Sequence, residues 1–360
     1  MDPMTSRFVS ALSLAALLGS GVACTSPAGQ SPAPSSLTDP DALLRAALVD
    51  YNDRNNIAIA AADGLDASKW KLADTGPALE GDLVQNVFRR HDKDRKAMEP
   101  FDMVAVRQLG APVTSGQGSS LLGMVVNGPR GAATARPTTG APTTAASPAS
   151  APAGNATPGA SATPSSGAAV RTLIVLTRAD AAAPWLLQMS SRLPDSVGDL
   201  GTVRQAYDTE RASAVAVVKA VTDYWTNRDV SAGVDLGTIP AERATIGTPS
   251  WGQKETSYTC AIDTDPSGEP LVRAAATGQG IIGVGAFHCT YTLTYAKASK
   301  VPKLLDKQRE LWGSPTGAVL TVPQRGGVTV RVPSDGGRPQ VMWWFLDDGM
   351  APALIPAAMG

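Results

Sequence analysis

A low-complexity tract divides this chain and limits how it can fold. Residues 129–168 are almost entirely Ala, Pro, Thr, Ser and Gly, and their only charges are Arg130 and Arg136. Such a segment lacks the apolar side chains needed to offset the conformational entropy lost on ordering. We therefore predict that it is disordered. Composition leaves open whether it is a plain connector or carries O-linked sugars.

The N-terminus has the pattern of a secretory signal. Arg7 precedes an apolar run, Val9–Leu18, and the small residues 19–23 lead to Cys24. The run is too short to span a bilayer. A short basic region, an apolar segment of this length and small residues before the cleavage point are typical of a signal peptide.

The same segment resembles a bacterial lipobox, although Gly21 stands where that family usually has Leu. The resemblance implies that residues 1–23 are removed and that the thiol of Cys24 receives diacylglycerol. Residues 24–37, rich in Ser, Pro and Ala, would then be a flexible tether. We expect a lipid-anchored protein on the extracytoplasmic face of a membrane. The alternative is an ordinary signal peptide that ends near a cysteine.

The two remaining cysteines are expected to form a disulfide. Tyr258, Cys260 and Ile262 alternate onto one face of a predicted strand. Cys289 and Tyr291 do the same on another strand, so both thiols point into one core. An even pair in an oxidising compartment favours a crosslink.

Charge excludes one class of partner. The chain has 31 basic and 32 acidic residues, a formal net charge of -1. Nothing in this balance favours nucleic acid.

The first half of the chain predicts helices followed by strands. Thr38 or Asp39 is the expected N-cap of the first helix, with Pro40 near its first position. Its apolar stripe is Leu44, Ala47, Leu48 and Tyr51. A second helix is predicted over Leu83–Arg95, with Leu83, Val84, Val87 and Phe88 facing inward. Strands are predicted at Phe101–Gln108, Leu121–Val126, Arg171–Arg178 and Trp185–Ser191.

The second half repeats this order. A helix is predicted over Thr209–Asn227, and its Val217, Ala220, Val221, Asp223 and Tyr224 match Leu44, Ala47, Leu48, Asp50 and Tyr51 at one offset. Each half ends in a predicted hairpin, the first around Asp180 and the second around Asp335–Gly337.

These patterns predict an α+β fold of two tandem modules, residues 38–195 and 196–360. Each is expected to be a long helix packed on a curved antiparallel sheet, with the disordered tract as an insertion in the first. The alternative is an N-terminal domain ending near Val126, a true linker, and a C-terminal domain from Val170.

Two resemblances accompany this prediction. The element order, helix then curved sheet, resembles the cone fold of the nuclear-transport-factor-2-like superfamily. The lipobox, the tract and three C-terminal runs resemble uncharacterised actinobacterial secreted lipoproteins. These runs are Tyr291-Thr-Leu-Thr-Tyr, Val301-Pro-Lys-Leu-Leu and Val328-Thr-Val-Arg-Val-Pro. The second resemblance implies a compartment and no assigned chemistry.

Catalytic and cofactor motifs find little support. Gly278, Gly280 and Gly283 satisfy G-x-G-x-x-G, but the following residues alternate as a strand, so a tight turn is expected instead of a dinucleotide site. His91 and His288 have no motif partner and cannot supply a three-histidine metal site. We predict no cofactor and no metal.

Two groups of carboxylates remain. Asp263, Asp265 and Glu269 surround Pro266 and Gly268, which indicates a turn that does not follow the spacing of a calcium-binding EF-hand loop. Asp347 and Asp348 follow the last predicted strand. They are the candidate acid and base if the protein is an enzyme.

Aromatic residues are the better candidates for a binding surface. Trp343 and Trp344 are adjacent on a predicted strand and must face opposite sides of the sheet. With Tyr224 and Trp225 they are the candidate binding residues, for a small apolar ligand or an envelope protein. The alternative is that a neighbouring helix covers them.

A cluster of Lys297, Lys300, Lys303, Lys307 and Arg309 around apolar residues indicates an amphipathic segment. It would suit an anionic envelope surface or simply a solvated helix face. The leading hypothesis is a membrane-anchored, non-catalytic module that binds a ligand or envelope partner. The alternative is a cell-envelope enzyme that uses Asp347 and Asp348.

Overall fold

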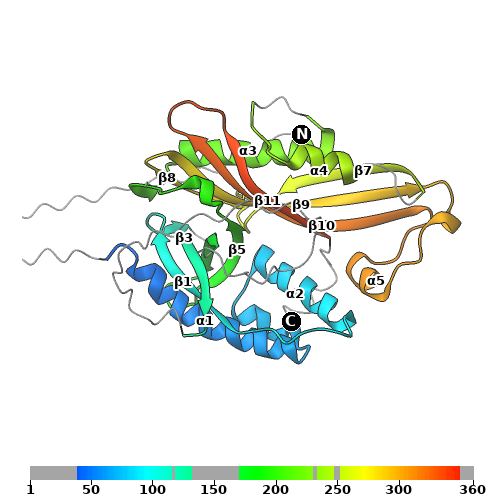
Figure 1. Ribbon diagram of the computed structural model, residues 1–360, viewed down its shortest axis with the longest axis horizontal. Helices are drawn as coiled ribbons and strands as arrows, with labels where there is room; N and C mark the ends of the chain where they lie inside the picture. Colours follow the sequence, from blue (N-terminus) through cyan, green and yellow to red (C-terminus); the bar gives the residue numbers. More distant parts are fainter. Residues whose placement is uncertain (1–38, 116–117, 132–169, 230–232, 247–251, 349–360) are drawn as a thin grey trace, which may run out of the picture. The chain divides into compact units, whose positions relative to one another are not determined.

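Two antiparallel sheets, each with a long helix on one face, organise the chain (Figure 1). The computed structural model describes residues 39–115, 118–131, 170–229, 233–246 and 252–348. The mixed α+β class predicted from the sequence is confirmed.

The first sheet has the strand order β1-β3-β4-β5, with β2 paired to β3. Its strands are β1 (Phe101–Gln108), β2 (Val113–Ser115), β3 (Gly118–Pro129), β4 (Arg171–Arg178) and β5 (Leu186–Arg192). The helices before it are α1 (Ala42–Asp63), the 3-10 helix η1 (Ala67–Leu72) and α2 (Gly76–His91).

The second sheet has the order β11-β10-β9-β8-β6, with β7 paired to β9. Its strands are β6 (Val203–Gln205), β7 (Gln253–Ile262), β8 (Val272–Thr277), β9 (Gly280–Tyr295), β10 (Val319–Pro333) and β11 (Gln340–Asp348). The helical elements of this part are η3 (Asp195–Val197), α3 (Asp208–Asn227), α4 (Ile239–Ile246), η4 (Ala298–Lys300) and α5 (Asp306–Trp312).

Each long helix packs closely on its sheet because a central strand places a glycine beneath it. A Cβ at Gly123 of β3 would lie 2.7 Å from Cδ1 of Leu44 in α1. A Cβ at Gly285 of β9 would lie 2.8 Å from Cγ2 of Val218 in α3. A larger residue at either position would push the helix away from the sheet.

The other faces of the two sheets pack against each other. From the first sheet this shared core takes Leu122, Met124, Leu173, Val175 and Met189. From the second it takes Ala275, Ile282, Val284 and Ala286, together with Leu271 just before β8. Ser191 Oγ also lies 2.7 Å from Thr329 Oγ1 across the interface. Each sheet is therefore covered on both faces, by a helix and by the other sheet.

Side chains of α1 form hydrogen bonds with backbone groups of β1, the edge strand of the first sheet. Asn52 donates to the backbone oxygen of Met103 at 3.0 Å and accepts from its nitrogen at 2.9 Å. Asn56 accepts from the backbone nitrogen of Phe101 at 3.1 Å. Polar groups of strand β1 that would otherwise lie open for pairing with another chain are thus occupied by the helix.

Most predicted elements are present, but two helix starts were wrong. The first helix begins at Ala42, and its N-cap is Asp41 instead of Thr38 or Asp39. Asp39 Oδ1 accepts a hydrogen bond from the backbone nitrogen of Asp41, ahead of the helix. Thr38 lies outside the described residues. The second helix covers Gly76–His91 instead of Leu83–Arg95, because Pro77 lies in its first turn, where a missing N–H costs nothing.

Strands β3 and β4 flank the low-complexity tract in the sequence and are neighbours in the sheet. They pair antiparallel, with Val126 opposite Arg171. Residues 132–169 lie outside the described residues, as do the signal segment, Cys24 and the tether. Both predicted hairpins are confirmed, since β4 pairs with β5 and β10 with β11.

The predicted disulfide is present. Cys260 of β7 and Cys289 of β9 lie directly opposite each other in the strand register and are joined. Cys289 is buried in the core between α3 and the second sheet, as the alternation predicted.

Candidate functional site

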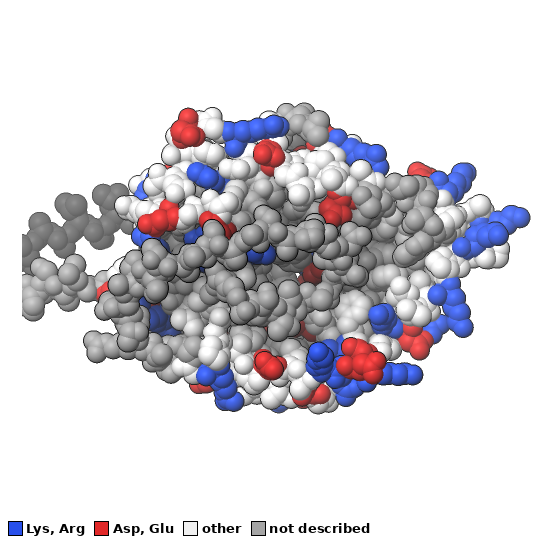
Figure 2. Space-filling view, viewed as in Figure 1, with Lys and Arg blue, Asp and Glu red and all other residues white. Residues whose placement is uncertain are grey.

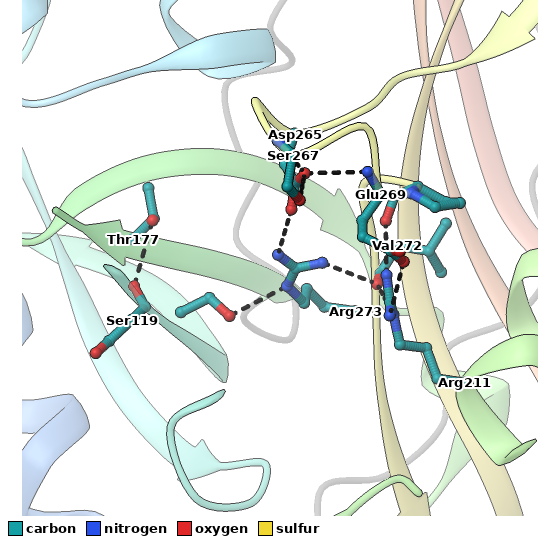
Figure 3. Close-up of polar contacts among 10 residues, drawn as sticks. Ser119, Thr177, Arg211, Asp265, Ser267, Glu269, Val272 and Arg273 are labelled. Atoms are coloured by element: carbon teal, nitrogen blue, oxygen red, sulfur yellow. Dashed lines mark hydrogen bonds and ion pairs between the residues drawn. The ribbon is translucent and has the colours of Figure 1, made fainter. Parts of the chain in front are cut away.

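The richest polar chemistry of the described residues surrounds the turn between β7 and β8. Asp265 Oδ1 accepts from the backbone nitrogens of Ser267 at 2.9 Å and Glu269 at 3.1 Å (Figure 3). The predicted turn is confirmed. Its carboxylates, Asp263, Asp265 and Glu269, do not converge on one ion, because each is directed to a different cation.

Asp263 belongs to a chain of four ionisable side chains. Its Oδ1 lies 2.7 Å from His288 Nδ1, and its Oδ2 accepts from Arg325. Arg325 also donates to Glu80 of α2. His288 and Arg325 face each other across β9 and β10. His288 has no motif partner in the sequence, but folding brings Asp263 to it from the turn after β7.

Two arginines hold the other side of the turn (Figure 3). Arg273 donates from Nε to Ser120 Oγ of the first sheet at 3.1 Å, and its Nη2 lies 3.9 Å from Asp265. Arg211 of α3 donates to the backbone oxygen of Pro270 at 3.0 Å. Its Nη1 lies 3.6 Å from Glu269 Oε2. The turn therefore links both sheets and α3.

Protonation in this network follows from its contacts. The hydrogen bond to Asp263 raises the pKa of His288, although partial burial opposes it. Burial lowers the pKa of Arg325 to about 10. Because this value is still well above 7, the guanidinium remains charged at neutral pH. For Asp265, burial acts to raise the pKa, but the hydrogen bonds from Ser267 and Glu269 bring it below its usual value.

The Asp263–His288 pair has only part of a catalytic arrangement. A carboxylate orients the imidazole, and the side chain of His288 is 43% exposed. Acyl transfer would also require a nucleophile in hydrogen-bond contact with the imidazole. Within the described ranges, the imidazole of His288 makes one hydrogen bond, and its partner is Asp263. The same ranges contain no cluster of three or more His, Cys, Asp or Glu that could hold a metal.

A second group of buried carboxyls lies between α1 and α2. Tyr51 donates from its hydroxyl to Asp74 Oδ1 at 3.2 Å. Burial raises the pKa of Asp74 to about 6, opposed by hydrogen bonds from Asp82 and Tyr51. Burial and the neighbouring Asp74 raise the pKa of Asp82. No sequence motif marks this group, because its members come from three separate elements.

These shifts predict a stability that falls as the pH rises from about 4, through about 6 for Asp74 and above 6.5 for His288. A carboxyl or imidazole whose pKa is raised by folding stabilises the folded state when protonated, and this contribution is lost as the pH rises through the folded value. Asp74, Asp82 and His288 all act in this direction. Asp74→Asn should raise the free energy of unfolding at pH 8 by about 2 to 3 kcal/mol, at about 1.4 kcal/mol per pKa unit, and by less than about 1 kcal/mol at pH 4.

Urea unfolding at several pH values measures this effect. Asp66→Asn is the matched control, because hydrogen bonds from Ser68 lower the pKa of this exposed carboxyl. Its contribution is lost only in more acidic solution, so its profile from pH 5 to pH 8 should follow the unmodified protein. An Asp74→Asn profile that also follows it would contradict the assignment of the buried pair.

The candidate aromatic residues are divided between two environments. Trp225 is fully buried in the core under α3, and Tyr224 packs beside it. Trp344 covers Trp225, with ring centroids 5.7 Å apart, and donates from Nε1 to Thr238 at 2.9 Å. Trp343 lies on the other face of β11, where its ring centroid is 5.4 Å from that of Phe345.

The remaining candidates are placed as follows. Asp347 and Asp348 occupy successive positions of β11, opposite Arg325 and Gln324, so the register puts these positions on alternate faces of the sheet. His91 Nε2 lies 3.0 Å from Glu310 of α5. Gly278 lies in the turn between β8 and β9, and Gly280 begins β9 with a φ of +117°. The expected turn is confirmed.

Comparison with known proteins gave no match: no protein-family model, no curated protein and no solved structure is significantly similar to the chain. In the part of the chain that the structure describes, no helix has the length and apolarity needed to cross a bilayer.

Proposed function

We propose that this protein is a lipoprotein anchored by Cys24 at the extracytoplasmic face of a membrane, where its paired α+β modules bind an envelope partner without catalysing a reaction. The signal segment, the lipobox resemblance and the Cys260–Cys289 disulfide support the compartment. The low-complexity tract is proposed to be a loop inserted between two neighbouring strands of the first module.

One observation favours binding over catalysis. In a helix-on-sheet cone, a small molecule would occupy the concave face of the sheet that the helix leaves open. Here those faces are filled by the shared core of the two sheets, including Leu173, Val175, Ile282 and Val284. The charged groups at the edge of this core are paired with one another. A partner would therefore contact the outer surface.

The anchor is tested by Cys24→Ala in the native host. We expect the unmodified protein in the membrane fraction after a high-salt wash, and the variant in the soluble extracytoplasmic fraction or the medium, because a thioether-linked lipid is lost with the sulfur. The wash removes proteins held only by charge. Immunoblotting of the fractions and the intact mass of the protein report the result. A variant that stays in the washed membranes would refute the anchor.

The absence of catalysis is tested by complementation of a deletion strain. Asp347→Asn, Asp348→Asn and His288→Gln should each restore the function of the unmodified gene. A folded variant among them that fails would favour the enzyme alternative. The disulfide and the membrane fraction serve as evidence that each variant is folded and located correctly.

A further inference from the structure

A basic surface forms where the loop after α2 approaches α5. It consists of Lys93, Arg95 and Lys96 from the loop, Lys297, Lys300 and Lys303 from the connection between β9 and α5, and Lys307 from the first turn of α5. The two segments are joined because α2 packs on α5: Arg90 and His91 both contact Glu310. Figure 2 shows Lys and Arg side chains gathered at the right of the view, where Figure 1 places α5.

The acidic residues beside this surface are largely neutralised within the fold. Asp306 pairs with Arg309, and Glu310 pairs with Arg90. Asp63 is bonded to Arg89 at 2.6 Å. Among the described residues, none of the seven cations forms an ion pair. Asp92, Asp94 and Glu99 in the same loop also form none, so seven cations less three carboxylates leave a net charge of +4, against -1 for the whole chain.

An apolar side chain lies among these lysines. Leu305 is 59% exposed, whereas its neighbours Leu304 and Leu311 are buried. Leu304 packs on the second sheet beside Leu293 and Leu320, and Leu311 packs on Val84 and Val87 of α2. The two buried leucines fix the segment, so Leu305 and the lysines are presented to the solvent without further ordering. Lys93 and Arg95 also line an open depression of about 390 Å³.

From this geometry we infer that the basic surface binds the anionic headgroups of a phospholipid membrane, with Leu305 inserted at the level of the headgroups. Flexible lysines around an exposed leucine are suited to this interface, since they gain from the negative surface potential while the apolar side chain leaves water. This inference deepens the proposed function, on which it rests for the presence of a membrane. A soluble anionic polymer would benefit from the charge but not from Leu305.

The test uses the full chain carrying Cys24→Ala, so that no acyl group contributes. We expect it to sediment with vesicles of phosphatidylcholine and phosphatidylglycerol at low salt, and not with phosphatidylcholine alone. High salt should release it. Lys300→Glu/Lys303→Glu should lower the partition coefficient by about tenfold or more, because reversing two charges lowers the net charge near the membrane by four units. Leu305→Ser should lower it by about threefold and leave the salt dependence unchanged.

The control is Arg192→Glu/Lys219→Glu, which makes the same change of charge at exposed positions on β5 and α3, two elements that contribute no residue to the basic surface. It should bind as the unmodified protein does. An equal loss in both double variants, or no binding to anionic vesicles at low salt, would overturn the inference. Binding to soluble polyphosphate without binding to vesicles would also overturn it and identify an anionic polymer instead. Membrane release by Cys24→Ala in cells tests the anchor separately, so the two failures are distinguishable.

Discussion

Replacing Arg325 with methionine is expected to lower the free energy of unfolding by about 3 to 5 kcal/mol, the usual cost of breaking a buried ion pair from one side. The side chains of Arg325, Asp263 and Glu80 are 12%, 9% and 16% exposed. Removing the guanidinium leaves two carboxylates with little access to water and no shared cation. Urea unfolding at pH 7 measures the loss.

The same substitution at an exposed pair provides the control. Arg204 and Glu210 form an ion pair at 2.6 Å, and the Arg204 side chain is 47% exposed. Arg204→Met should change the free energy of unfolding far less than Arg325→Met, because solvent screens an exposed ion pair. Adding Glu80→Gln to Arg325→Met should recover part of the loss. Equal effects of the two arginine substitutions would show that the network contributes no more than a surface pair.

Removing the disulfide is the second large effect. Cys260→Ala/Cys289→Ala should lower the free energy of unfolding by about 3 to 4 kcal/mol, because the crosslink closes a loop of 29 residues in the unfolded chain. Both cysteines are replaced together so that no unpaired thiol remains in the core. Denaturant unfolding of the purified variant measures the change.

Cys24→Ala is the matched control, since it removes a cysteine that takes no part in the crosslink. Its unfolding midpoint should equal that of the unmodified protein, measured in the same detergent-containing buffer. If the double variant unfolds at that midpoint too, chain entropy is not the main contribution of the disulfide.

Much of the secondary structure was accessible from periodicity alone. The stripe of α3, Ala214, Val217, Val218 and Val221, is buried as predicted, and β1 and β4 have the predicted bounds. These elements have regular apolar spacing that holds whatever they pack against. The early start of α2 was missed because its first turn, Gly76 to Leu79, has little periodic pattern of its own.

The packing of the sheets on each other was not predicted, although the sequence contained a signal. Leu121–Val126 and Leu173–Leu176 contain no charged or polar residue at any position. A strand with one solvated face alternates, whereas an unbroken apolar run is covered on both sides. The run in β3 also includes Gly123, which lies under α1, where the close approach of Leu44 leaves no room for a side chain.

The polar network could not have been predicted from spacing. Glu80 and Arg325 are 245 residues apart, and Asp263 and His288 are 25 apart. Only the tertiary fold brings these side chains together. The turn at Asp263–Glu269 was predicted correctly because Pro266 and Gly268 act locally. Its partners depend on elements from four other parts of the chain.

The pairing of β3 with β4 has a consequence for how the chain tolerates cleavage. A protease that cuts between Gly131 and Val170 would leave every described helix and strand whole. The two fragments would remain joined by eight residue pairs of the β3–β4 ladder and by the shared core. The protein should then behave as a complementing split pair, in which two separately produced polypeptides assemble into one folded unit.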